Sequence, residues 1–361
     1  MRKRNAVRAA AAALAAMMAL TACGGGGGNE TTAAAGGDTG STAAGGDAAV
    51  SGSGEVGKTD ITVAMGADIV TLDPAGQQDT TTAVVIKHAY STLLDISDEG
   101  ELVPDLAESY ELVNDTDFVF KLREDAVWSD GTPVTANDVK FTFDRAKNMP
   151  KTKSNTSKVK EVVVDNEHQV TIKLTEPYAP FNTIVASSNL SIVQEAAVTA
   201  AGEAYGDADN IVTSGPFTVK EWVPNDHYTL EKNANYWGEE PITTSITVRV
   251  IPEGSARAIA LETGEVDLVW GVDPTDCSNI EANSDVKLLS QPSSSIEYLG
   301  MNMTKEHFKD QKVRQAINYA IDKQALVDTI VEGRGTVANS YINNTIPGWT
   351  DEVEAYPYDP A

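Results

Sequence analysis

Cysteine and basic residues are both scarce in this sequence. The 361 residues include two cysteines, Cys23 and Cys277, and 27 lysines and arginines against 53 aspartates and glutamates. The formal net charge is −26 at pH 7. Nucleic acids and anionic lipid surfaces both attract proteins through clusters of Lys and Arg. The composition therefore argues against binding of nucleic acid and against electrostatic docking on a membrane.

Motifs for metal binding and catalysis are lacking. The four histidines are far apart, and none forms the H-E-x-x-H pattern of a zinc site. The G-x-S-x-G motif of a serine nucleophile is absent as well. Residues Gly333 to Ala338 match G-x-G-x-x-A by letter, but they follow an expected helix, whereas a dinucleotide site follows a strand. The sequence thus predicts a protein that is not an enzyme and has no metal and no cofactor.

The N-terminus has the features of an export signal. Basic residues at positions 2, 3, 4 and 8 precede an apolar stretch, Ala9 to Leu20, that is too short to span a bilayer. The stretch ends in Leu20-Thr21-Ala22-Cys23, which resembles a bacterial lipobox. The resemblance implies a signal peptide over residues 1–22 and lipidation of Cys23. A plain secretory signal with an accidental cysteine is the alternative. No later apolar run predicts a transmembrane helix, and lipidation would leave Cys277 without a disulfide partner.

A low-complexity segment follows the export signal. Residues Gly24 to Gly57 are mostly Gly, Ala, Thr, Ser and Asp, and large apolar side chains are almost absent. Such a segment cannot bury enough surface to offset the conformational entropy of folding. We expect residues 23–58 to form a flexible tether. The remaining chain, about 300 residues, exceeds a typical single core and is expected to form two or three domains.

The stretch from Leu106 to Phe143 predicts a β-hairpin followed by a capped helix. Apolar residues alternate with polar ones at the spacing of half-buried strands, namely Tyr110, Leu112, Phe118, Phe120 and Leu122. Asn114 and Asp115 lie between the two arms, as expected of a turn. Thr135 and Asp138 have the spacing of a capping box. The helix that follows is expected to carry Val139, Phe141, Phe143 and Ala146.

Periodicity predicts further elements on either side of this stretch. Strands are expected over 61–65, 159–164, 170–174, 245–251 and 268–270, and the second and third of these should form a hairpin around residues 165–167. Helices are expected over 80–94, from a cap at Ser255 to a stop at Gly264, and over 313–321. Ile259 and Leu261 should form the apolar face of the second helix. The core face of the third should comprise Val313, Ala316, Ile317, Ala320 and Ile321.

The residue identities in these segments are more informative than their apolar periodicity. Five motifs are the most informative: Ala107-Glu108-Ser109-Tyr110, Phe120-Lys121-Leu122-Arg123, the run from Trp128 to Val139, Gly264-Glu265-Val266-Asp267 and the run from Val313 to Lys323. In these segments the chain resembles the family 5 solute-binding proteins of ABC importers, which bind oligopeptides, dipeptides or nickel. The resemblance covers residues 59–361. It also implies that residues 295–303 form a strand that crosses from a first lobe to a second.

The resemblance implies an α/β protein with the two-lobed fold of type 2 periplasmic binding proteins and an extra inserted α+β subdomain. Residues 59–98 and 207–297 would form the first lobe, residues 99–206 the inserted subdomain, and residues 298–361 part of the second lobe. The sequence ends at Tyr358-Asp359-Pro360-Ala361. In the family that it resembles, this motif lies in the middle of the second lobe. The second lobe is therefore expected to be incomplete.

Ligand contacts are expected at two loops of the first lobe. In an open α/β sheet, ligands bind beyond the carboxyl ends of the strands, and loops 66–74 and 271–274 follow two of the expected strands. The candidate ligand-binding residues are Ile69, Thr71, Trp270, Val272 and Asn302. Asp68 and Asp73 are interpreted as loop and capping residues. Trp270 is the best single candidate, and packing of its ring in the core is the alternative.

The resemblance implies a lipid-anchored extracytoplasmic receptor that captures a solute and delivers it to an ABC permease and its ATPase. A peptide is the expected solute, because backbone hydrogen bonds can hold a peptide whatever its side chains. Nickel chelates, haem, oligosaccharides and opines are alternative solutes. A surface adhesion protein without a role in transport is an alternative of another class. The receptor is expected to be a monomer, attached through Cys23 to the outer face of the cell membrane or facing the periplasm.

Overall fold

The described part of the chain forms two compact units. The computed structural model describes residues 57–97, 100–291, 293–344, 346 and 348–360. One unit comprises the chain up to Ile61 together with Asp68–Val248, and the other comprises Thr62–Ala67 together with the chain from Arg249 on. The expected lobe boundaries stay predictions. The expected signal peptide, Cys23 and all but the last two residues of the expected tether lie outside the described residues.

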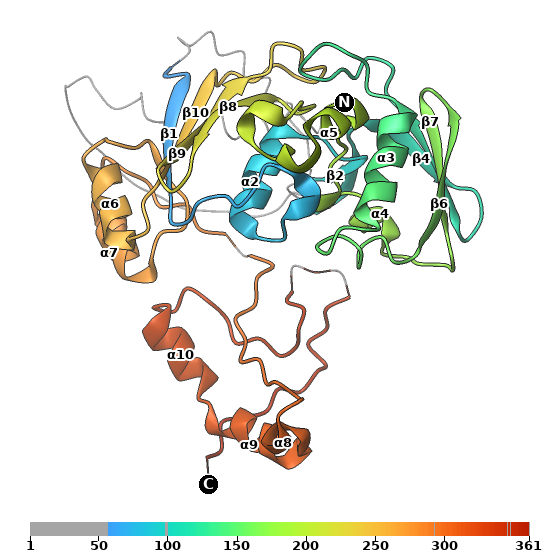
Figure 1. The fold of residues 1–361 in the computed structure, drawn as a ribbon. Helices are drawn as coiled ribbons and strands as arrows, with labels where there is room; N and C mark the ends of the chain where they lie inside the picture. The colour runs from blue at the N-terminus through green and yellow to red at the C-terminus, as the bar shows by residue number, and fades with distance from the viewer. Residues whose placement is uncertain (1–56, 98–99, 292, 345, 347, 361) are drawn as a thin grey trace, which may run out of the picture. The chain divides into compact units, whose positions relative to one another are not determined.

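Strands and helices are mixed along the chain (Figure 1), in agreement with the expected α/β class. The strands are β1 Asp60–Met65, β2 Leu94–Ile96, β3 Leu102–Pro104, β4 Ala107–Leu112, β5 Asp117–Leu122, β6 Val159–Asn166, β7 Gln169–Leu174, β8 Phe217–Val223, β9 His227–Lys232, β10 Ser245–Val250 and β11 Leu268–Val269. The helices are α2 Thr80–Ala89, α3 Ala136–Ala146, α4 Phe181–Ile184, α5 Glu195–Ala201, α6 Gly254–Glu262, α7 Pro274–Ala282, α8 Glu306–Lys309, α9 Gln311–Ala320 and α10 Lys323–Ile330. The sheet orders are β11-β1-β10-β9-β8, β4-β5-β7-β6 and β2-β3.

The four-stranded sheet of the first unit is built from the two expected hairpins. β4 pairs with β5 and β6 pairs with β7, both antiparallel, and Tyr110 lies opposite Phe120. At the first turn, Oδ1 of Asn114 accepts hydrogen bonds from the backbone N–H groups of Thr116 and Asp117 at 2.9 and 3.0 Å. An Asn side chain that bonds to the backbone a few residues on stabilises a turn. The predicted hairpins and the predicted turn are thus confirmed.

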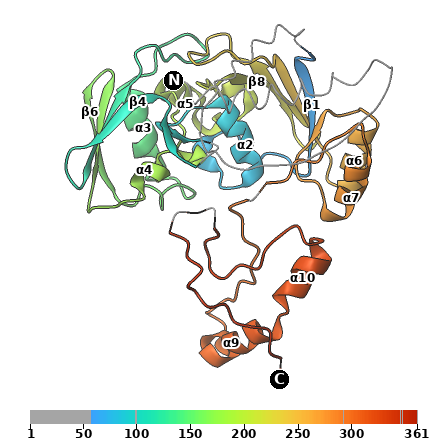
Figure 2. The same cartoon turned by 180° about the vertical axis from the view of Figure 1, so that it is seen from behind.

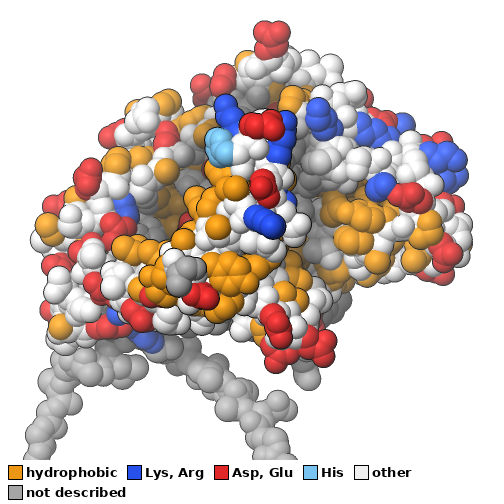
Figure 3. Space-filling model, turned by 90° about the horizontal axis from the view of Figure 1, so that it is seen from below, with side chains coloured by type: hydrophobic (Ala, Val, Ile, Leu, Met, Phe, Trp, Pro, Cys, Tyr) orange, Lys and Arg blue, Asp and Glu red, His pale blue; other side chains and the backbone are white. Residues whose placement is uncertain are grey.

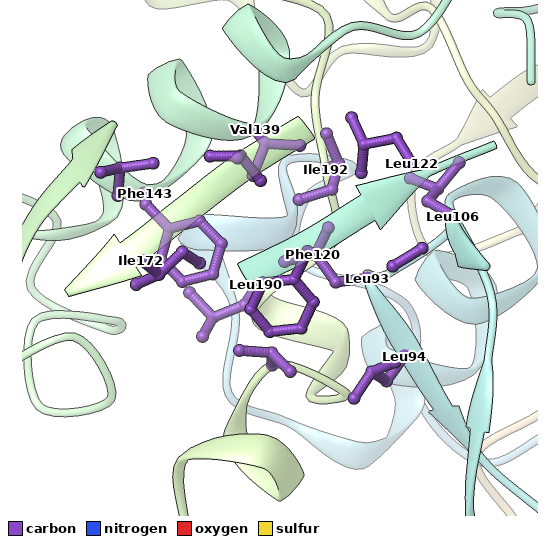
Figure 4. Packing of buried hydrophobic residues seen from close by; sticks show 14 of the residues in the cluster. Leu93, Leu94, Leu106, Phe120, Leu122, Val139, Phe143, Ile172, Leu190 and Ile192 are labelled. Atoms are coloured by element: carbon purple, nitrogen blue, oxygen red, sulfur yellow. The ribbon is translucent and has the colours of Figure 1, made fainter. Parts of the chain in front are cut away.

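The main core of the first unit lies between this sheet and helix α3, which crosses one face of the sheet (Figures 1 and 2). Phe120 and Ile172 of the sheet share one cluster with Val139 and Phe143 of α3 (Figure 4), and all four side chains are fully buried. Complete burial of one such side chain stabilises the fold by about 1.5–3 kcal/mol. The fully buried Trp128 belongs to the same cluster, so the family motifs in this stretch contribute to packing.

Helix α3 begins where the capping pattern predicts. Thr135 is its N-cap, and the carboxylate of Asp138 accepts a hydrogen bond from the backbone N–H of Thr135 at 3.0 Å. This bond satisfies an amide that the helix itself leaves without an acceptor. The other oxygen of Asp138 accepts from the backbone N–H of Glu195 at 3.0 Å. Asp138 therefore also joins α3 to the first residue of α5.

Two expectations for the first unit are wrong. Tyr110 and Leu112 were expected to be half-buried, but they are 40% and 48% exposed. Their strand, β4, is the outer strand of the sheet, so it has a neighbouring strand on one side only. Helix α2 ends at Ala89 rather than at Leu94. The backbone of Tyr90 is extended, with φ −126° and ψ 156°, and Leu94 begins a strand.

In the second unit, helix α6, strand β11 and helix α7 follow one another closely in the chain, whereas β1 comes from its beginning. β11 pairs with β1 in parallel, with Val63 opposite Leu268. The carboxylate of Asp267 accepts a hydrogen bond from the backbone N–H of Thr62 at 2.7 Å, which fixes the starts of the two strands. Helices α6 and α7 lie side by side in both ribbon views (Figures 1 and 2). Gly264 ends α6 with φ +74°, a conformation that favours glycine, as predicted.

Several expectations for the second unit are wrong. The N-cap of α6 is Glu253, and Ser255 is the second residue of the helix. The buried residues of α6 are Arg257 and two alanines, because the small side chains face β11. Ile259, which was expected on the buried face, is 59% exposed. No residue of α9 is fully buried. Residues 295–303 pair with no strand in the described part of the chain, and an unpaired segment cannot satisfy its backbone groups as a strand does.

Candidate functional site

The loop from Gly66 to Pro74 follows β1 and carries two of the candidate ligand-binding residues. Ile69 is buried, with 3% of its surface exposed, whereas Thr71 is half-buried. The carboxylate of Asp68 accepts hydrogen bonds from Nε1 of Trp222 at 3.1 Å and from the backbone N–H of Asn225 at 2.7 Å. Asp68 thereby ties this loop to the β8–β9 hairpin, in agreement with its interpretation as a loop residue.

Asp73 forms a buried ion pair with Arg145 of α3. The two carboxylate oxygens accept from Nη1 and Nη2 of the guanidinium at 2.8 and 2.6 Å. The side chains are 7% and 19% exposed. Oδ1 of Asp73 also accepts from the backbone N–H of Ala75 at 3.1 Å, which caps the short helix Pro74–Gly76. The capping role expected for Asp73 is confirmed, and the paired, two-point contact adds geometric specificity.

Two tyrosines enclose this ion pair. The guanidinium carbon of Arg145 lies 5.5 Å from the ring centroid of Tyr205, and the hydroxyl groups of Tyr205 and Tyr90 are 3.3 Å apart. Burial raises the pKa of both tyrosines, so both hydroxyls stay neutral at physiological pH. Desolvation acts to lower the pKa of Arg145, but the hydrogen bonds and charge of Asp73 outweigh it and raise that pKa. The loop is therefore held to α3 by a charged contact inside neutral surroundings.

A pocket of about 730 Å³ opens beside this loop in the first unit. Its lining residues are Val70, Thr71, Gly76, Gln77, Gln78, Asp79 and Lys151. The side-chain amide of Gln78 donates to the backbone carbonyl of Lys151, which joins the two parts of the lining. The volume lies in the range of small-molecule sites, and polar groups on its wall could orient a ligand. Of the five candidate residues, Thr71 lines this pocket.

The loop after β11 is held by a buried arginine that the sequence did not reveal. Nη1 of Arg257 donates to the carbonyls of Ile251 and Pro252 at 2.9 and 2.8 Å. Nη2 donates to the carbonyl of Gly271 at 3.0 Å and to Oδ1 of Asp273 at 3.2 Å. A Cβ atom at Gly66 would lie 2.9 Å from Nη1, so a larger residue there would displace the guanidinium. Arg257 thus binds the carboxyl ends of several segments of the second unit together.

The remaining candidates lie in the second unit. Trp270 is 54% exposed, which contradicts the alternative of a core tryptophan. Its backbone N–H donates to the carbonyl of Ala64 at 2.9 Å, so the indole stands at the end of β11. Val272 is half-buried and Asn302 is exposed. Oδ1 of Asn302 accepts from the backbone N–H of Thr304 at 3.0 Å, which makes it a turn residue. Roles of these residues in ligand binding stay predictions.

Sequence reasoning missed Arg145, Arg257 and Lys151. Each is a basic residue in an acidic chain, in or next to an expected helix, where a charged side chain usually faces solvent. The first two are instead enclosed, with partners that are distant in sequence or in loops. Arg145 lies in the helix that the family motif opens, and its position beside Phe143 and Ala146 is the one signal that could have indicated burial.

The described residues show neither a metal centre nor a membrane span. No group of three or more His, Cys, Asp or Glu side chains in the described ranges is arranged to hold a metal ion. None of the helices that the structure describes has the length and apolar character needed to cross a bilayer. On the face shown in Figure 3, acidic, basic and hydrophobic side chains are interspersed.

The chain belongs to a family of binding proteins. Residues 101–361 match the family described as bacterial extracellular solute-binding proteins, family 5. The class expected from the motifs is thereby confirmed, and members of this class are receptors for solutes rather than enzymes. The glutathione-binding protein GsiB of Escherichia coli (strain K12) is 32% identical over 306 residues, which are 83% of this chain and 59% of that relative.

Solved structures of similar proteins confirm the expected fold. The periplasmic binding protein DppA from Helicobacter pylori, in complex with the peptide STSA, matches with a TM-score of 0.73 at 26% identity, over 83% of this chain and 64% of that one. MoaA from A. tumefaciens R10, in complex with mannopinic acid, matches with a TM-score of 0.77 at 26% identity, over 84% and 63%. NikA from Brucella suis, in complex with Fe(III)-EDTA, matches with a TM-score of 0.73 at 27% identity, over 84% and 62%. The chain therefore spans less than two thirds of these relatives.

Proposed function

We propose that this protein is a lipid-anchored extracytoplasmic receptor that captures a peptide and delivers it to the permease and ATPase of an ABC importer. Membership of the family carries the proposal. The pocket beside the Gly66–Pro74 loop supports it, because its wall combines apolar and polar groups within the volume of a short peptide. The receptor acts as a monomer, and hinge closure around the solute precedes delivery.

The domain arrangement of this proposal is the one implied by the motifs. Residues 59–98 and 207–297 form the first lobe, 99–206 the inserted subdomain, and 298–361 part of the second lobe. In this arrangement Ile69, Thr71, Trp270 and Val272 lie on the first lobe, and Asn302 lies where the chain enters the second. These five residues are proposed to contact the solute.

A peptide is proposed over other solutes for a physical reason and by analogy. Hydrogen bonds to the backbone of a peptide can form whatever its sequence, and the side chains of the peptide then enter pockets that accept different residues. One similar structure holds a four-residue peptide, and the relatives named for glutathione bind a peptide-like thiol. Mannopinic acid and Fe(III)-EDTA in other similar structures make an opine or a metal chelate the competing solute.

Membrane attachment is proposed to depend on Cys23. The cysteine follows a basic and then an apolar segment, the order found in export signals. The acidic net charge of −26 would not favour an anionic lipid surface, so acyl chains on Cys23 would supply the attachment. The low-complexity residues up to 58 would then act as the tether.

Calorimetric titration of the purified protein tests the solute class. Mixtures of di-, tri- and tetrapeptides should give saturable binding, and opines, nickel–histidine and haem should give none at the same concentrations. Binding of an opine or a metal chelate without peptide binding would replace the peptide in this proposal while leaving the receptor class intact. Absence of binding by every solute class would count against the receptor function itself.

A further inference from the structure

A basic segment interrupts this acidic chain. Residues 145–160 contain one arginine and five lysines and no acidic residue, although the whole chain has a net charge of −26. Asp144 and Glu161 lie directly outside the segment. The segment runs from the end of α3 to the start of β6. A concentration of one sign of charge raises the local concentration of solutes with the opposite sign.

Half of these basic side chains are engaged by carboxylates. Arg145 pairs with Asp73, Lys147 pairs with Asp144 at 3.3 Å, and Lys158 pairs with Glu176. The other three are Lys151, Lys153 and Lys160, and none of them forms an ion pair with another described residue. The segment therefore keeps positive charge that the fold itself does not neutralise.

One of these three lysines lines the pocket. Lys151 is the only basic residue among the lining residues, and the chain is held there because Gln78 donates to its backbone carbonyl. Lys151 is exposed, so its ammonium group is free to meet a ligand. Lys153 lies two residues away and does not belong to the lining. The lining of the pocket thus contains one basic side chain, and its backbone is held in place by Gln78.

The other polar groups of the pocket are used within the protein. Oδ1 of Asp79 accepts from the backbone N–H of Thr82 at 2.8 Å and caps α2, where the positive end of the helix offsets its charge. Oγ1 of Thr71 accepts from the backbone N–H of Asp73 at 3.1 Å. The side-chain amide of Gln77 donates to Oγ of Ser188 at 3.3 Å. The ammonium of Lys151 is therefore the charged group that the pocket leaves for a ligand.

We propose that Lys151 binds a carboxylate of the solute, so that this receptor favours peptides with a carboxylate over the same peptides with a neutral amide in its place. The inference rests on the proposed function, since it names the chemical class of the peptide that the receptor captures. A hydrogen bond between an ammonium and a carboxylate is stronger than one between neutral groups. The carboxylate comes either from the C-terminus of the peptide or from an Asp or Glu side chain.

Matched peptides distinguish these two sources. One tripeptide is titrated with a free C-terminus and with a C-terminal amide, and a second pair differs by Glu against Gln. The wild-type protein should bind one acidic form about tenfold more tightly than its neutral partner, which is 1.4 kcal/mol. The pair that shows the difference identifies the source of the carboxylate. The preference should weaken as salt is raised, because exposed charges are screened.

Variants assign the preference to one lysine. Lys151→Met should abolish the preference for the acidic form, and Lys151→Arg should keep most of it. Lys153→Met removes the same charge from the same segment outside the pocket, and it should leave the preference within about twofold of wild type. All three variants should melt within about 2 °C of wild type, because these side chains are exposed.

Three results would overturn the inference. Equal affinity of the wild-type protein for both members of both pairs would show that no carboxylate is recognised, while peptide binding itself would stand. An equal loss of preference in Lys153→Met and Lys151→Met would assign the effect to the general field of the segment rather than to the pocket. Failure of the wild-type protein to bind both these four peptides and the peptide mixtures would refute the proposed peptide function and this inference with it.

Discussion

Removal of Arg145 is the perturbation whose effect the structure defines best. Arg145→Met keeps an unbranched aliphatic side chain and removes the guanidinium, whose carbon lies 5.5 Å from the ring centroid of Tyr205. Asp73 then loses both of its contacts with Arg145, at 2.8 and 2.6 Å. Its carboxylate, 7% exposed, keeps the bond from the backbone N–H of Ala75 at 3.1 Å. One negative charge is left in a site that water hardly reaches.

The expected loss of stability follows from that uncompensated charge. Breaking a buried ion pair by removing one partner destabilises proteins by about 3–5 kcal/mol. Arg145 is 19% exposed, so solvent relieves part of the effect and about 3 kcal/mol is the more reasonable value. For a unit of this size, that loss lowers the melting temperature by roughly 10 °C. The double variant Asp73→Asn, Arg145→Met should lose less than the sum of the single variants.

Urea unfolding followed by circular dichroism measures these free energies. Lys140→Met is the matched control, because Lys140 lies on the same helix and its partner Asp144 is 2.6 Å away, but both side chains are about half exposed, at 45% and 44%. This control should lose about 0.5 kcal/mol or less. If Arg145→Met lost no more than the control, or if the two single variants were additive, the buried pair would not hold the loop to α3.

Three further predictions concern acid stability, the candidate ligand contact and the anchor. Burial lowers the pKa of His88 below 6.5 in the folded protein, so the unfolded chain takes up the proton more readily. The free energy of unfolding should therefore fall as pH drops below 6.5. His88→Gln should lessen this loss in thermal melts recorded between pH 7 and pH 5. The half-buried His227 is the opposite case, since its hydrogen bond to Asp226 raises its pKa. His227→Gln should therefore increase the loss of stability at low pH. Trp270→Ala should weaken solute binding by about 1–3 kcal/mol in calorimetric titrations, with little change in melting temperature because the indole is 54% exposed; a large stability loss at unchanged affinity would contradict a contact role. Cys23→Ser should move the protein from the membrane to the soluble fraction after cell fractionation, and a variant that stays with the membrane as wild type does would contradict lipid attachment.

Short-range patterns in the sequence predicted the local structure well. The turn at Asn114, the capping box of Thr135 and Asp138 and the end of α6 at Gly264 all formed as expected. Each depends on groups only a few residues apart, so the physics that selects them is already present in a short peptide. The family motifs were equally predictive, because they record which fold the whole set of segments adopts.

Burial of individual side chains was predicted less well. Tyr110 alternates correctly with its neighbours but lies on the outer strand of its sheet, and Ile259 lies on the exposed side of α6. Periodicity shows that an element has an apolar side and a polar side. Which side is covered, and how completely, depends on the elements that pack against it, and those come from other parts of the chain.

The charged contacts were decided by tertiary structure alone. Asp73 and Arg145 are 72 residues apart, and Gln78 reaches the carbonyl of Lys151 across 73 residues. In the sequence, each of these side chains has the appearance of an ordinary solvent-facing polar residue. Long-range packing placed Arg145 in a largely buried ion pair with Asp73. It left Lys151 at the pocket without a carboxylate partner among the described residues. Sequence determined the elements, the family and the acidic background; the fold determined which of the few positive charges are paired inside it and which one remains at the pocket for a ligand.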